Sequence, residues 1–203
     1  METLFLNNEI IGYKTTHVSK LSKEELLSVI EDEIKNQPDI VTDAFNLSAK
    51  MTEISDIVDF AIGKCSELAE QSNVVYNEIH SEVWANRISA QNPILNQRVT
   101  TVIEGAHYHI HTELNKEGKK FIPHYTFVYY VQMPDNLSGV EGALLIKNTK
   151  EDVYVFNPKE NDLIILDANT PHSPMGSPNS TKDRMVIAGN VAFANIKKQK
   201  SMF

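Results

Sequence analysis

The stretch Tyr125–Val131 reads YTFVYYV and is the clearest strand of the chain, because it consists almost entirely of aromatic and β-branched residues. Similar apolar runs follow it, and turn residues separate them. Short strands at regular spacing with turns between them are typical of a β-sandwich or barrel. We therefore expect a sheet-rich C-terminal half with strands at 125–131, 142–146, 153–156, 162–166 and 185–193.

The segments before this region contain both helix and strand patterns. Ser22 and Glu25 form a capping-box pattern, which predicts a helix that ends at Pro38. An apolar stripe at helical spacing predicts a second helix over much of 48–71. We also expect an early strand within residues 1–18 and strands at 74–79, 82–88 and 97–104. The predicted architecture is an N-terminal helical layer followed by a β-sandwich, in one domain.

Length, charge and cysteine content restrict the function. The chain has 203 residues, enough for one domain with its own core. Its formal charge of −8 argues against a nucleic-acid partner, since such binding depends on clustered Lys and Arg. The single cysteine, Cys65, allows no internal disulfide. We find no signal peptide and no apolar run that could span a bilayer, so we expect a cytoplasmic protein without a membrane partner. Oligomeric state is not readable from the sequence.

Residues 105–113 read GAHYHIHTE and carry the strongest chemical signal. On an extended strand, His107, His109, His111 and Glu113 would all point to the same side. Imidazoles with one carboxylate suit Fe(II), Mn(II), Zn(II) or Cu(II) better than a hard cation such as Mg²⁺. We expect a metal site here.

Two later residues extend this pattern. His172 stands between two prolines, and Arg184 begins the last long strand. Two imidazoles and one carboxylate on one face of octahedral Fe(II) leave positions open for a bidentate keto acid and O₂. An arginine can hold the far carboxylate of such a co-substrate with its bidentate fork.

This ordered set resembles the Fe(II)/2-oxoglutarate-dependent oxygenases, and among them the prolyl-4-hydroxylase-like branch. The pattern Gly-x-x-Tyr-x-x-His-x-acid of that branch is matched by Gly105, Tyr108, His111 and Glu113. The resemblance covers roughly residues 82–194. Further similar segments are the strand 126–131, the Gly-x-Leu strand at 142–144, and the Asp-hydrophobic strand at 161–166 with His172 and Arg184 after it.

The resemblance implies a fold and an activity. The fold is a mainly β, α+β double-stranded β-helix (jelly roll), with residues 1–73 as an N-terminal strand and packing helices, 74–195 as the β-helix core and 196–203 as a tail of one domain, 1–203. The activity is hydroxylation of a peptide or small-molecule substrate, coupled to succinate and CO₂ formation. The implied cofactors are Fe(II), 2-oxoglutarate and, as a further candidate, ascorbate. The implied metal ligands are His111, Glu113 and His172, and the implied co-substrate residues are Arg184, Tyr129, Tyr130 and Asn190.

The chain departs from the family pattern in three places. Glu113 stands where Asp is usual, and Asn161 replaces a glycine before Asp162. His107 and His109 add competing ligands, which we place outside the metal-binding set, although a pairing of His109 with His111 stays open. Strand alternation allows only one of Tyr129 and Tyr130 to face a cavity. Trp84 is expected in the core or in a pocket wall.

Two other functions compete with this one. A cupin-type metal enzyme also begins its motif with His-x-His, but the Pro-x-Gly that should precede its last His is missing here. A non-catalytic β-sandwich that binds a ligand or partner is the second alternative.

Overall fold

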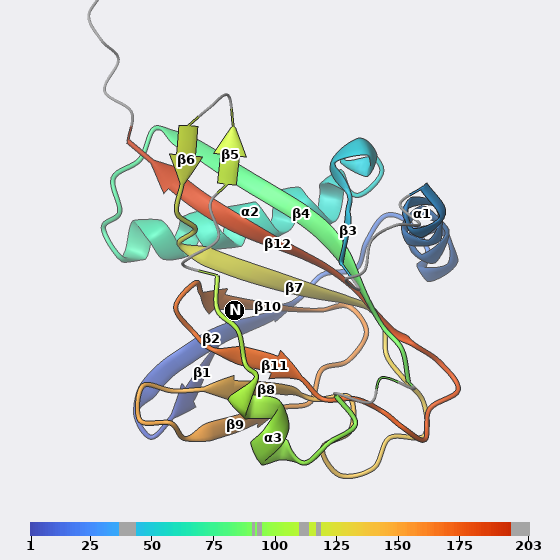
Figure 1. Cartoon of the computed structure of the whole chain (residues 1–203). Helices are drawn as coiled ribbons and strands as arrows, with labels where there is room; N and C mark the ends of the chain where they lie inside the picture. Colours follow the sequence, from blue (N-terminus) through green and yellow to red (C-terminus); the bar gives the residue numbers. More distant parts are fainter. Residues whose placement is uncertain (37–43, 91, 93–94, 110–113, 117–118, 196–203) are drawn as a thin grey trace, which may run out of the picture.

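The computed structural model describes residues 1–36, 44–90, 92, 95–109, 114–116 and 119–195. A large antiparallel sheet runs through the molecule (Figure 1). Its strands, in spatial order, are β1 (Glu2–Leu6), β2 (Glu9–Thr16), β10 (Asp162–Asp167), β7 (Tyr125–Gln132), β12 (Arg184–Ala194), β4 (Glu78–Ile88) and β3 (Ala44–Asn46).

A smaller antiparallel sheet lies opposite the large one. It contains β11 (His172–Pro174), β8 (Leu144–Lys147) and β9 (Val153–Phe156), in that order. An isolated bridge between His107 and His172 extends it at the β11 edge. A separate hairpin joins β5 (Leu114–Lys116) to β6 (Lys119–Phe121). Two facing antiparallel sheets make the jelly roll, or double-stranded β-helix, so the predicted mainly β fold class is confirmed.

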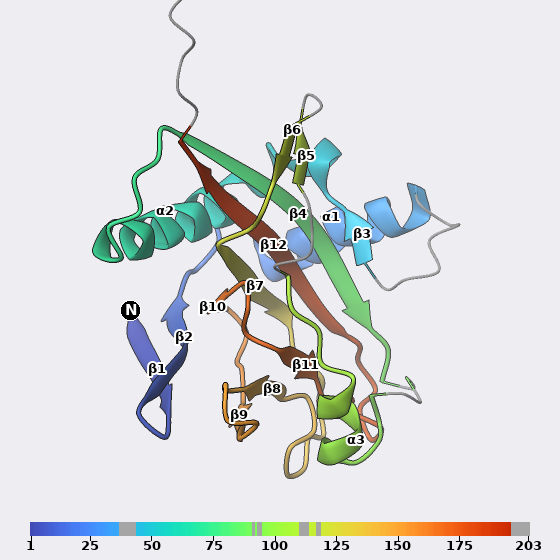
Figure 2. The same ribbon diagram turned by 60° about the vertical axis from the view of Figure 1, so that its left-hand side comes forward.

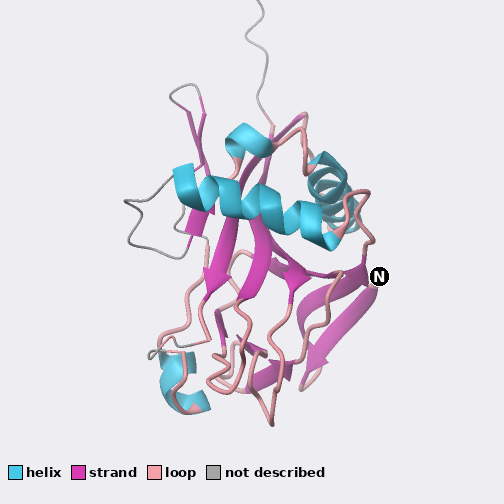
Figure 3. Ribbon diagram, turned by 90° about the vertical axis from the view of Figure 1, so that its right-hand side faces the viewer, coloured by secondary structure: helices cyan, strands magenta, loops and turns pink. Residues whose placement is uncertain are grey.

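The N-terminal helices cover the outer face of the large sheet (Figure 3). They are α1 (Lys23–Asn36) and α2 (Ser55–Gln71), with a 3-10 turn, η1 (Ser48–Lys50), before α2. Their apolar sides pack on odd-numbered strand residues such as Phe127 and Ile187, which are fully buried. The predicted capping box is present at α1: Ser22 N–H donates to Glu25 at 2.7 Å, and Glu25 N–H donates to Ser22 Oγ at 3.2 Å. Because odd residues face the helices, even residues of β4, β7 and β12 face the smaller sheet.

The segment around Val99 contradicts the prediction from local composition. Residues 97–104 were expected to form a strand, but Val99–Glu104 is a helix, α3. Val102 and Ile103 are buried there against Leu145 of the smaller sheet and Met175, which directly follows β11, and α3 lies beside this sheet (Figure 2). This packing outweighs the weak preference of β-branched residues for strands. The strand expected at 82–88 lies within β4, which begins at Glu78, so residues 74–77 of the strand expected at 74–79 are not part of a strand.

One turn departs from the family pattern. Asn161, which replaces the family glycine, has a φ of +69°, a left-handed conformation that Asn tolerates better than most residues.

In the histidine-rich segment, His107 forms a bridge and His109 lies in a bend, so the described part is not a regular strand. Residues 110–113, including His111 and Glu113, lie outside the described residues. None of the helices in the described ranges is long and apolar enough to cross a membrane.

Candidate metal and co-substrate site

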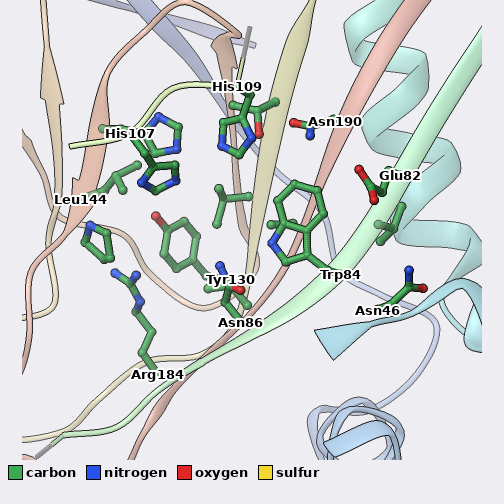
Figure 4. A pocket seen from close by; sticks show the side chains of 17 residues that line it. Asn46, Glu82, Trp84, Asn86, His107, His109, Tyr130, Leu144, Arg184 and Asn190 are labelled. Carbon is green, nitrogen blue, oxygen red and sulfur yellow. The ribbon is translucent and has the colours of Figure 1, made fainter. Parts of the chain in front are cut away.

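A cavity of about 470 Å³ lies between the two sheets (Figure 4). Its floor is the even-numbered face of β4, β12 and β7, where Ala188 is the smallest side chain. The segment 107–109, β11 and β8 form the opposite wall. The cavity is lined by Asn46, Glu82, Val83, Trp84, Asn86, His107, His109, Thr126, Val128, Tyr130, Leu144, His172, Pro174, Arg184, Val186, Ala188 and Asn190.

Three histidines meet at one side of this cavity. One ring nitrogen from each of His107, His109 and His172 lies within 4.8 Å of the others. The backbone holds them there: His107 and His172 exchange N–H···O hydrogen bonds of 3.1 and 2.9 Å, and His109 N–H donates to Ala168 O at 2.8 Å. Three imidazole nitrogens this close form a set that suits Fe, Zn, Cu or Ni.

The protonation state of these rings favours metal binding. His172 Nδ1 lies 2.9 Å from the carbonyl oxygen of Thr170, so Nδ1 carries the proton and Nε2 keeps a free lone pair. Burial lowers the pKa of His172 to about 3. Burial, with a smaller contribution from His107, lowers the pKa of His109 to about 4, and burial also lowers the pKa of His107. Near neutral pH all three rings are uncharged, the form that binds metal ions.

Arg184 and Tyr130 form a second polar group in the cavity. The Arg184 side chain is 4% exposed, and neither its Nε nor its Nη1 has a hydrogen-bond partner among the described residues. The hydroxyl of the fully buried Tyr130 also has none there. Burial lowers the pKa of Arg184 and raises the pKa of Tyr130 to about 12. A buried cation without a counter-ion is costly, so this pair forms a preorganised site for an anion.

Tyr129 points to the other side of the sheet. Its hydroxyl lies 2.8 Å from Asn161 Oδ1 and 3.1 Å from the carbonyl oxygen of His17, in the layer between sheet and helices. Of the two tyrosines proposed from the sequence, Tyr130 lines the cavity and Tyr129 does not. Because side chains alternate along a strand, only one of the two tyrosines could face the cavity. The helices pack on the face that carries Tyr129, so Tyr130 faces the cavity.

The other end of the cavity is lined by β3, β4 and β12. Asn190 is fully buried, and both atoms of its amide lack partners in the described structure. Glu82 lies directly across from Asn190 in the β12–β4 ladder. The indole of Trp84 is stacked on His109, with ring centres 5.8 Å apart and planes at 26°. Glu82, Trp84 and Asn86 therefore form a polar and aromatic part of the floor next to the histidine cluster (Figure 4).

The structure gathers most of the residues proposed from the sequence. One cavity contains His172, Arg184, Tyr130 and Asn190, and Trp84 forms part of its floor. His107 and His109, which the sequence analysis placed outside the metal-binding set, lie beside His172. Three further residues line the cavity without having been predicted from the sequence: Glu82, Asn86 and Asn46. Glu82 and Asn86 flank Trp84 at alternate positions, and this spacing could have identified these two residues as part of one strand face.

Comparison with known proteins gives matches in structure alone. No protein-family model and no curated protein sequence matches the chain. HygX from Streptomyces hygroscopicus with nickel and 2-oxoglutarate bound superposes with a TM-score of 0.54 at 12% identity, over 93% of this chain and 85% of that one. The fold of this chain is that of the 2-oxoglutarate–Fe(II) oxygenases.

Two prolyl hydroxylases show the same likeness. The enzyme from Trichoplax adhaerens, in complex with a hypoxia inducible factor peptide fragment, gives a TM-score of 0.54 at 13% identity over 90% of this chain and 83% of that one. The Pseudomonas putida prolyl-4-hydroxylase gives 0.52 at 8% identity over 90% and 93%. The chain spans only 47% of a 2-oxoglutarate–Fe(II) oxygenase from Burkholderia pseudomallei and 60% of the Phytophthora capsici prolyl 4-hydroxylase.

Proposed function

We propose that the protein is an Fe(II)- and 2-oxoglutarate-dependent oxygenase that hydroxylates a small-molecule or peptide substrate. The observation that carries this proposal is the presence, in one cavity, of a three-histidine cluster and a buried Arg184 that has no counter-ion among the described residues. A metal site alone would fit many enzymes. A metal site with an unpaired guanidinium in the same cavity fits a metal with an anionic co-substrate.

In this proposal His107, His109 and His172 hold the metal. Their nitrogens are close enough to share one ion, and burial lowers the pKa of each ring, which favours the unprotonated form. The predicted ligands His111 and Glu113 adjoin this cluster in sequence but lie outside the described residues. Bound Fe(II) would supply the activation of O₂ by oxidative decarboxylation of 2-oxoglutarate to succinate and CO₂.

The other residues of the cavity bind and orient the co-substrate. The Arg184 guanidinium would hold the distal carboxylate of 2-oxoglutarate, and the Tyr130 hydroxyl would donate a hydrogen bond to it. Leu144, Val128 and Val186 line the cavity with apolar surface, which excludes water and strengthens these polar contacts. An anion bound here would satisfy the buried polar atoms of Arg184 and Tyr130, which have no partner among the described residues.

An anaerobic titration tests this function. Fe(II) and 2-oxoglutarate together should produce a weak visible metal-to-ligand absorption band, and aerobic incubation should release succinate slowly even without substrate. A cupin-type enzyme would bind the metal without that band. A non-catalytic binding module would give neither the band nor succinate, and either result would contradict the proposal.

A further inference from the structure

Building on the proposed function, we infer that the substrate carries a primary ammonium group, held by Glu82 and Asn190 against the face of Trp84. This inference concerns the end of the cavity away from Arg184. It assigns Asn190 to the substrate, whereas the sequence analysis had grouped it with the co-substrate residues.

The cavity floor is built of rows that run across the strands. Glu82, Asn190 and Thr126 form one row across β4, β12 and β7. Trp84, Ala188 and Val128 form the next row, and Asn86 with Val186 and Tyr130 the one after. Directly opposed side chains in such a ladder lie about 5 Å apart, so Glu82 and Asn190 can contact one group together.

The two charged residues of the floor lie at opposite ends. Arg184 and Asn190 are six residues apart on β12, which at about 3.3 Å per residue places Glu82 roughly 20 Å along the sheet from Arg184. The view in Figure 4 agrees, with Arg184 and Glu82 on opposite sides of the cavity. An anion held by Arg184 and a cation held by Glu82 would therefore occupy separate places.

Asn190 indicates that the row of Glu82, Asn190 and Thr126 binds a ligand. It is 0% exposed, and both its Oδ1 and its Nδ2 lack hydrogen-bond partners among the described residues. Leaving a buried amide unpaired costs free energy, which a bound donor would recover at Oδ1. The neighbouring Thr126 hydroxyl is already used, because it donates to Gly189 O at 3.1 Å.

Glu82 determines the charge of that ligand. It is the one carboxylate among the described residues that line the cavity, and no described residue forms a hydrogen bond or ion pair with it. A carboxylate accepts hydrogen bonds and attracts cations, and an ammonium group donates three. The Asn190 carbonyl oxygen is a further acceptor, so the row matches an ammonium group better than an alcohol or an acid.

Trp84 connects this row to the metal cluster. It lies one row from Glu82 and is stacked on His109. An indole face attracts a cation and also packs against an apolar chain. A substrate whose ammonium group lies at Glu82 would thus place its adjoining carbon chain along Trp84, beside the histidines.

A matched pair of small probes tests the inference. The whole protein, loaded anaerobically with Fe(II) and 2-oxoglutarate, is titrated with n-butylammonium and with n-butanol by calorimetry. We expect the amine to bind at least ten-fold more tightly than the alcohol, and to shift the metal-to-ligand absorption band. Equal binding of the two probes would overturn the inference.

Two substitutions on the same strand locate the effect. Glu82→Gln keeps the size of the side chain but removes its charge, and we expect it to abolish the preference for the amine. Glu78→Gln is the control, because Glu78 is also on β4 but does not line the cavity, and it should leave the preference intact. If the amine still binds preferentially to the Glu82→Gln protein, it binds elsewhere, for example on the metal, and the inference is wrong.

The same titrations separate this inference from the proposed function. A 2-oxoglutarate band without amine preference would overturn only the substrate class. Amine preference without the band would leave an amine-binding cavity and contradict the oxygenase. The absence of both would contradict the two together.

Discussion

The guanidinium carbon of Arg184 lies 6.0 Å from the centre of the Tyr130 ring, and both side chains are buried with polar atoms that no described residue satisfies. Neighbouring strands hold the pair, since Val186, two residues after Arg184, lies opposite Tyr130 in the ladder between β12 and β7. Unpaired donors on a rigid sheet bind an anion without reorganising, which is how a protein gains affinity from few contacts.

Replacing Arg184 should specifically weaken co-substrate binding. We expect Arg184→Met to reduce 2-oxoglutarate affinity by about 2 kcal/mol or more, roughly 30-fold, because a buried carboxylate would lose its counter-ion. Fe(II) affinity should stay the same, since Arg184 is not part of the histidine cluster. Arg87→Met, which removes an exposed ion pair with Asp183, serves as the control. Unchanged 2-oxoglutarate binding in Arg184→Met would exclude our assignment.

The two adjacent tyrosines should respond oppositely to loss of their hydroxyl groups. Tyr130→Phe removes an unsatisfied hydroxyl, so the unliganded protein should be as stable as the wild type or more stable by about 1 kcal/mol. Tyr129→Phe removes a hydroxyl bonded to Asn161 and should destabilise the fold by about 1 kcal/mol. Urea unfolding measures both effects. A 2-oxoglutarate titration should show weaker binding only for Tyr130→Phe.

Alanine substitutions of the histidines should identify the metal ligands. We expect His107→Ala, His109→Ala and His172→Ala each to lower Fe(II) affinity by about 100-fold or more, since under the proposed function each removes a ligand and not merely a supporting contact. Equilibrium dialysis under nitrogen is the measurement. His111→Ala and Glu113→Ala belong in the same series, because the family pattern assigns the metal to these residues. Full affinity in His107→Ala and His109→Ala, with loss in the other two, would favour the family register.

Asp135 should make the fold sensitive to acid. The hydroxyl and backbone N–H of Thr181 and the hydroxyl of Ser180 donate to its carboxylate and lower its pKa to about 2. A folded-state pKa below the unfolded value of about 3.9 means that the unfolded chain takes up the proton first. This stabilisation is present above about pH 4 and is lost as the pH falls to about 2. Urea unfolding over this range should show a smaller pH dependence for Asp135→Ala, and an identical slope would contradict the assignment.

Two glycines offer a test of the sheet packing. At Gly189 a Cβ atom would lie 2.6 Å from the ring of Phe127 and 2.7 Å from the carbonyl oxygen of Glu82, so we expect Gly189→Ala to destabilise the fold by about 1–3 kcal/mol. At Gly63, in α2, a Cβ atom would meet nothing within 4 Å. Gly63→Ala should stabilise the helix by up to about 1 kcal/mol. Thermal unfolding of the two variants should move in opposite directions.

Part of the site could be predicted from strand periodicity. Because side chains alternate along a strand, Arg184 and Asn190 had to share a face, and Tyr129 and Tyr130 had to lie on opposite faces. The prediction for Val99–Glu104 was wrong, because burial of Val102 and Ile103 against the smaller sheet is a long-range effect that local preference cannot contain.

The sequence alone determined the sheet-rich sandwich-or-barrel class, the capping box at Ser22 and the residue types that the chemistry needs, since these depend on local pattern and composition. The resemblance to a family narrowed that class to a jelly roll. Only the tertiary structure decided which face of each strand lines the cavity. Alternation along a strand would make His107 and His109 equivalent in sequence, and backbone hydrogen bonds to distant residues, from His107 to His172 and from His109 to Ala168, bring both to the cluster. In the same way, the row that joins Glu82 to Asn190 exists only because β4 pairs with β12 in one register, which no local signal encodes.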